Sequence, residues 1–328
     1  MRLIIDADPG NGIAGSDVDD GLAIGLALNS PEVELLAVTV VAGNVTVDQG
    51  VQGALELLEA AGASHVPVHR GADRPLLEDP RAWRRLLDLR REDPKAQALW
   101  RDSPPAATAR SPDPRAACRV LVELVDAHPG EITVLAIGPL TNVATAMLLD
   151  PEWQHKVRQV VWMGGAFELP DLLQELNAAY DPEATHLVMT SDAPLLIVPL
   201  DVTMRTYMHL DEVARLETAG TPLAQYLGRM VRPWVTWLAA RFGREGCPLH
   251  DPLAMAALLD PTVIETRSRA ADIELAGRLT RGRTVAWDAT NEELMQVIVP
   301  LPKERPIQIA HSVDNDRFMP LLLERLTR

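Results

Sequence analysis

Five aspartates near the amino terminus are spaced so that they could hold a metal ion. Asp6 and Asp8 come directly after a short apolar run, and Asp17, Asp19 and Asp20 follow a glycine-rich stretch. Crowded negative charges are unfavourable unless a cation neutralises them, although a helix N-terminus offsets part of this cost at Asp19 and Asp20. Oxygen ligands without nearby cysteine or histidine favour a hard cation, calcium or magnesium, over zinc. The alternative is that these residues only form turns and cap a helix.

A second motif, His250-Asp251-Pro252-Leu253, adds an imidazole and a further carboxylate at the start of a predicted helix. A single histidine is more often structural than catalytic. The motif therefore gains meaning only together with the aspartate cluster.

The glycine-rich stretch poses a different question. Residues 10–15 match G-x-G-x-x-G between a predicted strand and a predicted helix, which is the setting of a dinucleotide site. The flanking aspartates would repel a pyrophosphate, and the second strand ends in Ala42-Gly43-Asn44, without an acidic residue for the ribose. We therefore reject a dinucleotide site. The sequence also lacks the G-x-S-x-G and H-E-x-x-H motifs of serine hydrolases and zinc proteases.

Apolar runs alternate with helical patterns along the chain. The runs predict strands at Leu3–Ile5, Leu35–Val41, Val66–His69, Ile132–Ile137, Val160–Met163 and Leu195–Pro199. The segments between them predict helices at 20–29, 47–61, 114–128, 140–149 and 182–190. Because these strands are almost continuously apolar, we expect one α/β domain over residues 1–328, an open, mostly parallel sheet with helices on both faces. Such sheets bind ligands at the carboxyl ends of their strands, where the first aspartates fall.

Three further features concern the remaining elements. Asp-Pro pairs at 150–151, 181–182, 251–252 and 260–261 predict helix starts, since Asp caps a helix and Pro fits its first turn. The stretch 77–114, rich in Arg, Asp and Pro, has weak periodicity and predicts a surface excursion. Residues 224–242 predict a helix whose Trp234 and Trp237 fit either core packing or a subunit interface.

Composition limits the partners of the protein. The chain has 328 residues, 47% of them hydrophobic, and a formal net charge of −15, which argues against nucleic acid and anionic membranes as partners. Its two cysteines, Cys118 and Cys247, are far apart, which is typical of a reducing compartment. The start of the chain lacks a signal-peptide pattern, and we find no run of about 20 apolar residues that would span a bilayer. We therefore expect a cytoplasmic protein.

Several segments resemble the motifs of the inosine-uridine preferring nucleoside hydrolase family. The matching segments are Asp6-Ala7-Asp8-Pro9-Gly10, Asp19-Asp20, Val41-Ala42-Gly43-Asn44, Gly71-Ala72-Asp73-Arg74-Pro75-Leu76, Ala136-Ile137-Gly138-Pro139-Leu140-Thr141-Asn142, Val161-Trp162-Met163-Gly164-Gly165, Glu175-Leu176-Asn177 and Cys247-Pro248-Leu249-His250-Asp251-Pro252-Leu253. They occur in the family's order over nearly the whole chain, and together they are specific.

The resemblance implies calcium-dependent hydrolysis of the N-glycosidic bond of a ribonucleoside. Matched residue by residue, it implies that calcium (Ca2+) is held by Asp8, Asp20, Asp251 and the main-chain carbonyl of Ile137. It gives ribose-binding roles to Asp19, Asn44, Glu175 and Asn177, and places Met163 in the sugar pocket. Asp8 would also be the general base, and His250 would be a candidate proton donor to the leaving base. The family further implies a homo-oligomer, dimeric or tetrameric.

The chemistry of bond cleavage agrees with these implied roles. Cleavage at C1′ passes through an oxocarbenium-like state, as in glycoside hydrolysis. Several carboxylates around one divalent cation leave net negative charge, which stabilises the positive charge that develops on the sugar. A metal ion also orients a water and lowers its pKa, so that Asp8 need remove only an acidified proton.

The chain departs from the family pattern at three places. Eight residues, Asn11 to Val18, separate Gly10 from Asp19, where the family typically has one. The segment after Met163 is short, and Asp171 only approximates the asparagine expected ahead of Glu175. No His-Gly pair occurs between residues 77 and 105, where many members carry one near the leaving base. These departures affect the substrate pocket more than the metal ligands.

Two alternatives stay open. A metal-dependent phosphohydrolase of the haloacid dehalogenase type also begins with a strand and Asp-x-Asp, but it requires Thr or Val where Gly10 stands. A non-catalytic ribose or nucleoside binder could retain the same metal site. The presence of Asp8 as an expected general base argues against a pure binder. This argument is only partial, because Asp8 is also an expected metal ligand.

Overall fold

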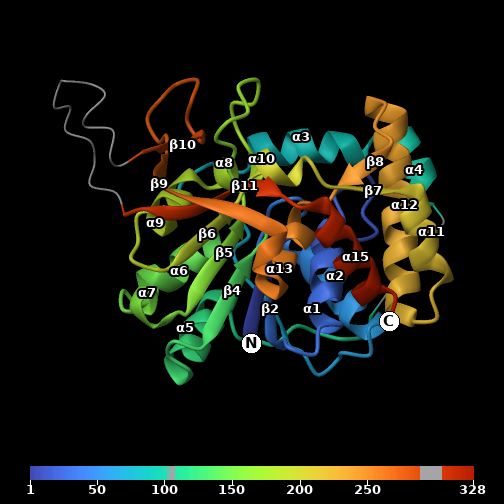
Figure 1. The fold of residues 1–328 in the computed structure, drawn as a ribbon, viewed down its shortest axis with the longest axis horizontal. Helices are drawn as coiled ribbons and strands as arrows, with labels where there is room; N and C mark the ends of the chain where they lie inside the picture. Colours follow the sequence, from blue (N-terminus) through green and yellow to red (C-terminus); the bar gives the residue numbers. More distant parts are fainter. Residues whose placement is uncertain (102, 104–107, 289–304) are drawn as a thin grey trace.

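A nine-stranded sheet forms the centre of the molecule, in the order β10-β9-β11-β6-β5-β4-β1-β2-β3 (Figure 1). The computed structural model describes residues 1–101, 103, 108–288 and 305–328. The strands are β1 Arg2–Ala7, β2 Glu34–Val40, β3 Val68–Arg70, β4 Ile132–Ala136, β5 Gln159–Met163, β6 Leu195–Val198, β9 Ile264–Ile273, β10 Thr284–Trp287 and β11 Ile307–Val313. The neighbours from β3 to β11 pair in parallel, whereas β9 and β10 run antiparallel at one edge. The predicted open, mostly parallel α/β sheet is confirmed.

Helices cover both faces of this sheet. Successive residues of β1 point into different cores: Leu3 and Ile5 pack with α1, α2, α12, α13 and α15, while Ile4 packs with α5, α6, α7 and α9 (Figure 1). The helices are α1 Asp19–Leu28, α2 Val47–Ala60, α3 Arg81–Arg91, α4 Pro94–Trp100, α5 Ala117–Ala127, α6 Thr141–Leu149, α7 Trp153–Lys156, α8 Leu176–Tyr180, α9 Pro182–Met189, α10 Leu200–Thr203, α11 Leu210–Thr218, α12 Pro222–Phe242, α13 His250–Leu259 and α15 Asn315–Leu326. Burial of each strand on two sides explains why its sequence is continuously apolar.

The six predicted strands and five predicted helices all form, with ends that differ by a few residues. The helix predicted at 224–242 also forms, as α12, between the capping side chain of Thr221 and the left-handed Gly243. Trp234 and Trp237 are buried within the chain. None of the helices in the described ranges is long and apolar enough to cross a membrane.

Some expectations are corrected. Asp181 and Asp260 cap α9 and a 3-10 turn at Pro261–Val263 as predicted, but Asp251 lies inside the first turn of α13, whose N-cap is Leu249. The stretch 77–114, predicted as a surface excursion, contains two helices, α3 and α4, which its weak periodicity did not indicate. The elements β9, β10, β11 and α15 had no sequence prediction. In β9, residues 265–268 are polar and exposed and lack an apolar pattern.

Candidate active site

The site lies where the strand order reverses around β1. β4 and β2 flank β1 on opposite sides, and the chain reaches them in different directions, which opens a crevice at the carboxyl ends of the strands. Asp8 follows β1, Asn44 follows β2, and Ile137 follows β4. The parallel sheet thus brings together residues that are far apart in sequence.

Asp8 is fully buried and held by two backbone contacts. The Asn44 N–H donates to Asp8 Oδ2 at 2.5 Å, and the Asp8 N–H donates to Asp20 Oδ1 at 2.9 Å. A Cβ atom at Gly43 would lie 2.0 Å from Asp8 Oδ2, and one at Gly138 would lie 3.0 Å from Oδ1, so backbone alone can approach the carboxylate here. Within the described chain, Asp8 Oδ1 is buried without a hydrogen-bond partner. A buried acceptor in this state calls for a cation or a water.

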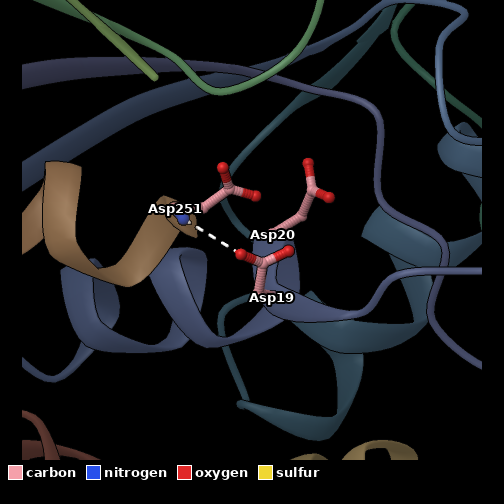
Figure 2. A group of neighbouring side chains, drawn as sticks. All are labelled: Asp19, Asp20 and Asp251. Atoms are coloured by element: carbon pink, nitrogen blue, oxygen red, sulfur yellow. Dashed lines mark hydrogen bonds between the residues drawn. The ribbon is translucent and has the colours of Figure 1, made fainter. Parts of the chain in front are cut away.

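Three more carboxylates meet beside Asp8, where α1 and α13 begin. Ligand atoms of Asp19, Asp20 and Asp251 all lie within 4.8 Å of one another, and Figure 2 shows the two helix ends that carry them. Asp19 Oδ2 accepts the N–H groups of both His250, at 2.8 Å, and Asp251, at 3.0 Å. Asp20 Oδ2 has no partner among the described residues. Asp19 therefore ties the two helices together, while Asp20 keeps one oxygen free.

The electrostatics of the site favour a cation. Burial raises the pKa of Asp8 to about 7, although the Asn44 N–H and the charge of Arg84 lower it. Burial and the neighbouring negative charges raise the pKa values of Asp20 and Asp251 well above the usual range. Each shift measures the cost of ionising these groups together. A divalent cation among them would remove that cost, and the oxygen-only donor set fits calcium or magnesium.

A cavity of about 610 Å³ lies above these carboxylates. Eight of the predicted site residues line it: Asp19, Asn44, Ile137, Met163, Glu175, Asn177, His250 and Asp251. Asp8 and Asp20 are not among its lining residues and lie at its floor, in contact with the residues that are. The volume falls within the range of small-molecule sites.

Glu175 and Asn177 are fixed by local hydrogen bonds at the cavity wall. The Glu175 carboxylate accepts the N–H groups of Gly165, Asn177 and Ala178, and so caps α8. The Asn177 amide donates to the carbonyl of Ile137 at 3.2 Å. Both side chains are thereby positioned before any ligand binds.

His250 faces the cavity and is anchored from behind. Its Nδ1 lies 2.7 Å from the hydroxyl oxygen of Thr203, a residue without a sequence prediction. Burial lowers the pKa of His250, so that the ring is neutral at pH 7.

Comparisons with known proteins identify the family of this site. A family model described as inosine-uridine preferring nucleoside hydrolase matches residues 3–320. The chain belongs to this family. It is 32% identical to the inosine-uridine preferring nucleoside hydrolase of Crithidia fasciculata, over 100% of this chain and 98% of that protein. The nucleoside hydrolase family is one of N-ribohydrolases, so the chain is an enzyme of that class, and the phosphohydrolase alternative is excluded.

Solved structures of nucleoside hydrolases share the fold. A plant nucleoside hydrolase superposes with a TM-score of 0.84 at 30% identity, covering 99% of this chain and 98% of that one. A purine-preferring ribonucleoside hydrolase from Gardnerella vaginalis gives a TM-score of 0.82 at 27% identity, covering 100% and 98%. The name of the second protein states a preference for purine ribonucleosides.

Two helices of this nucleoside hydrolase supply cavity residues that the sequence did not predict. Trp83 and Arg90 come from α3, and Trp234, Trp237 and Arg241 come from α12. The Trp234 and Trp237 rings stack at 5.2 Å, which makes a flat aromatic wall. The spacing of Trp83, Leu86, Leu87 and Arg90, without internal Gly or Pro, is a helical pattern that could have revealed α3.

The extra loop between Gly10 and Asp19 contributes one residue to this cavity. Asp17 lines the cavity but is not a member of the three-carboxylate group. Gly12 and Gly15 adopt left-handed conformations with φ of 74° and 71°, and α1 begins only at Asp19. Residues 10–15 therefore do not lead directly into a helix, as a dinucleotide loop would.

Proposed function

We propose that the protein is a calcium-dependent nucleoside hydrolase that cleaves ribonucleosides to ribose and free base. One observation carries the proposal: the unpartnered Asp8 Oδ1 lies with three further carboxylates at the floor of a nucleoside-sized cavity. A purely structural role would leave these buried charges uncompensated.

The residues proposed to hold calcium are Asp8, Asp20, Asp251 and the Ile137 carbonyl. Among these ligands, Asp8 Oδ1 and Asp20 Oδ2 are buried and have no hydrogen-bond partner in the described residues, and Asp251 lies opposite Asp20 (Figure 2). A bound calcium ion would supply positive charge that orients the ribose hydroxyls and the attacking water and lowers the pKa of that water.

Asp8 is proposed as the general base. The Asn44 N–H fixes the Asp8 carboxylate through Oδ2, and the Asp8 N–H is held by Asp20, so that the carboxylate can accept a proton from the attacking water without a change of rotamer. An oriented base near its working pH contributes about 10²–10⁴-fold to a rate.

The ribose is proposed to bind against Asp19, Asn44, Glu175 and Asn177, with Met163 beneath it. Their negative charge and oxygen atoms face the sugar, where positive charge develops as the glycosidic bond breaks. A site built to hydrogen-bond these hydroxyls leaves buried polar groups unpaired when a deoxy sugar binds.

His250 is proposed to protonate the departing base. The bond to Thr203 leaves Nε2 available to take up a proton from solvent, and the resulting imidazolium can donate that proton to the departing base. The walls on α3 and α12 would contact the base and set the preference among bases.

The state of the protein in solution is part of the same proposal. We infer one domain over residues 1–328, since β1 and β11 belong to one sheet, and a cytoplasmic homo-oligomer, as the family resemblance implies.

The test is release of reducing sugar from inosine, uridine, cytidine and adenosine, with calcium and with chelator. Calcium-dependent release that the Asp8→Asn variant lacks would support the proposal. Binding of calcium and ribose without release from any nucleoside would favour the non-catalytic binder instead.

A further inference from the structure

Helix α3 contacts the loop that holds Asp8. Arg84 Nη2 donates to the carbonyl oxygens of Gly43, at 2.6 Å, and Asn44, at 3.0 Å. About two helical turns further on, Arg91 Nη2 donates to the Asn44 carbonyl at 2.7 Å. Two guanidinium groups thus converge on two neighbouring carbonyls of a loop that has no side chain at position 43.

The peptide group between Gly43 and Asn44 links an arginine to Asp8. Its carbonyl oxygen accepts from Arg84, and its N–H donates to Asp8 Oδ2 at 2.5 Å. A hydrogen bond to the oxygen of a peptide polarises the group and strengthens the bond that its N–H makes. The charge of Arg84 makes this first bond a strong one.

Arg91 extends the same contact to helix α2. Its Nη1 donates to Gln49 Oε1 at 3.1 Å, and Gln49 forms the capping box of α2 with Thr46. The loop is therefore held between α2, which follows it, and α3, which lies over it. The Arg91 side chain is 14% exposed, so the contact is shielded from water.

Burial distinguishes Arg84 from a surface arginine. Its Nε and Nη1 atoms are buried and have no hydrogen-bond partner within the described ranges. A guanidinium placed in such surroundings is desolvated at a cost, which the two loop carbonyls offset only in part. Arg85, the next residue in α3, is exposed, and its side chain makes no hydrogen bond or ion pair in the described structure. It therefore lies on the same helix as Arg84 but does not contact the loop.

We propose that Arg84 and Arg91 are positioning residues that fix the Asp8 carboxylate through the Gly43–Asn44 peptide. The inference rests on the proposed function for its catalytic consequence. The hydrogen-bonded link from the arginines through the Gly43–Asn44 peptide to Asp8 does not depend on that function. Without the arginines, the loop loses three hydrogen bonds and the Asn44 N–H is free to move away from Asp8 Oδ2. Partners that orient a metal ligand from behind typically contribute about 10–100-fold to affinity or activity.

The experiment compares Arg84→Met and Arg84→Lys with the matched control Arg85→Met. Hydrogen exchange of the Asn44 amide is measured in the calcium-free protein, calcium affinity by calorimetry, and kcat and KM with uridine and inosine. Melting temperatures show that each variant is folded, and Arg91→Met serves in its place if Arg84→Met is not.

We expect Arg84→Met to speed exchange of the Asn44 amide and to weaken calcium binding or lower kcat by about 10–100-fold. Arg84→Lys should restore part of each effect, because it keeps one charged donor, and Arg85→Met should match the wild type. Unchanged exchange, or faster exchange with unaltered calcium affinity and kcat, overturns the positioning role. If the wild type neither binds calcium nor releases ribose, the proposed function fails, and the link then stands or falls on Asn44 exchange alone.

Discussion

The Asp19 carboxylate accepts the backbone N–H of Asp251 at 3.0 Å, across the meeting point of α1 and α13 (Figure 2). The same oxygen accepts the His250 N–H, so a residue from the start of the chain sets the position of two residues near its end. Asp20, the next residue, makes its one contact to Asp8 and leaves its other oxygen free. Neighbouring aspartates therefore have different tasks.

This division predicts different effects on metal binding. Asp20→Asn should weaken calcium affinity by more than about 10-fold, because it removes charge from an oxygen that nothing else satisfies. Asp19→Asn keeps an acceptor for the two N–H groups, so calcium affinity should change less while KM for ribonucleosides rises. Calorimetry and steady-state kinetics on both variants check the prediction; equal losses of calcium affinity would contradict it.

Replacing Asp8 by Asn should lower kcat by about 10²–10⁴-fold without unfolding the protein. The amide can still accept the Asn44 N–H, so the loop should stay in place, but it cannot take a proton. Sugar release and the melting temperature are the measurements. A variant as active as the wild type would remove Asp8 from the role of base.

The calcium-free protein should lose stability as the pH rises from about 5 to about 8. Burial raises the pKa of Asp8 from 3.8 to about 7, so the folded protein holds this proton more tightly than the unfolded chain does. That contribution is fully present below the unfolded pKa and is lost as the pH rises through the folded pKa, with a slope of about 1.4 kcal/mol per pH unit for each such proton. Calcium should remove most of the loss. Melting temperatures across this range, with calcium and with chelator, test both points, and a chelated protein that is most stable at about pH 8 would refute them.

Replacing His250 by Ala should slow hydrolysis of purine nucleosides more than hydrolysis of a nitrophenyl riboside, whose leaving group needs no proton. Thr203→Val should have a smaller effect of the same kind, because it removes only the hydroxyl that anchors the ring at 2.7 Å. Rates on both substrates give the comparison. Equal losses on the two would show that His250 is not the acid.

Replacing Gly15 by Ala should lower both stability and kcat. Gly15 has a φ of +71°, and a Cβ there would lie 2.8 Å from the Arg90 carbonyl oxygen, so the change would displace α3. Gly62→Ala is the matched control, since Gly62 has a φ of +66° and a Cβ there would meet nothing described within 4 Å. Both variants carry the cost of the left-handed backbone, about 1–2 kcal/mol, and only Gly15→Ala should also impair turnover. A similar kcat for the two would show that the loop does not support α3.

The sequence predicted the sheet well because its strands are buried on both faces. Their apolar runs predict strands that are buried on both faces, and the alternation of strands with helices then predicts a parallel arrangement. It did not predict β9, because residues 265–268 of that strand are polar and exposed, which is typical of a loop. The ends of helices were harder still: Asp251-Pro252 has the composition of a cap, yet tertiary contact with Asp19 places the aspartate inside the helix.

The residues of the candidate site likewise differ in how far the sequence could predict them. Asp8 could be predicted, because it follows the first strand and the carboxyl ends of strands in such a sheet meet at the ligand-binding edge. The role of Asn44 was implied only by the family resemblance. The contribution of α3 could not be predicted, since Arg84 acts on backbone carbonyls of a distant loop, and such contacts leave no motif in the sequence. Thr203 could not be predicted for a related reason: it contacts His250, which lies 47 residues further along the chain, and no local motif marks it.

A Cβ atom at Gly43 would lie 2.0 Å from Asp8 Oδ2, and one at Gly138 would lie 2.9 Å from Val41 Cγ1 and 3.0 Å from Asp8 Oδ1, so a side chain at either position would displace its neighbours. The backbone around Asp8 therefore tolerates few substitutions, whereas the walls on α3 and α12 consist of side chains that can be exchanged one at a time. Substitutions in those walls could therefore change the preferred nucleobase without changing the residues proposed to bind calcium and to activate water. Arg84 and Arg91 are the exceptions, because they lie on α3 but contact the loop that holds Asp8. Any library of α3 variants should therefore keep both arginines.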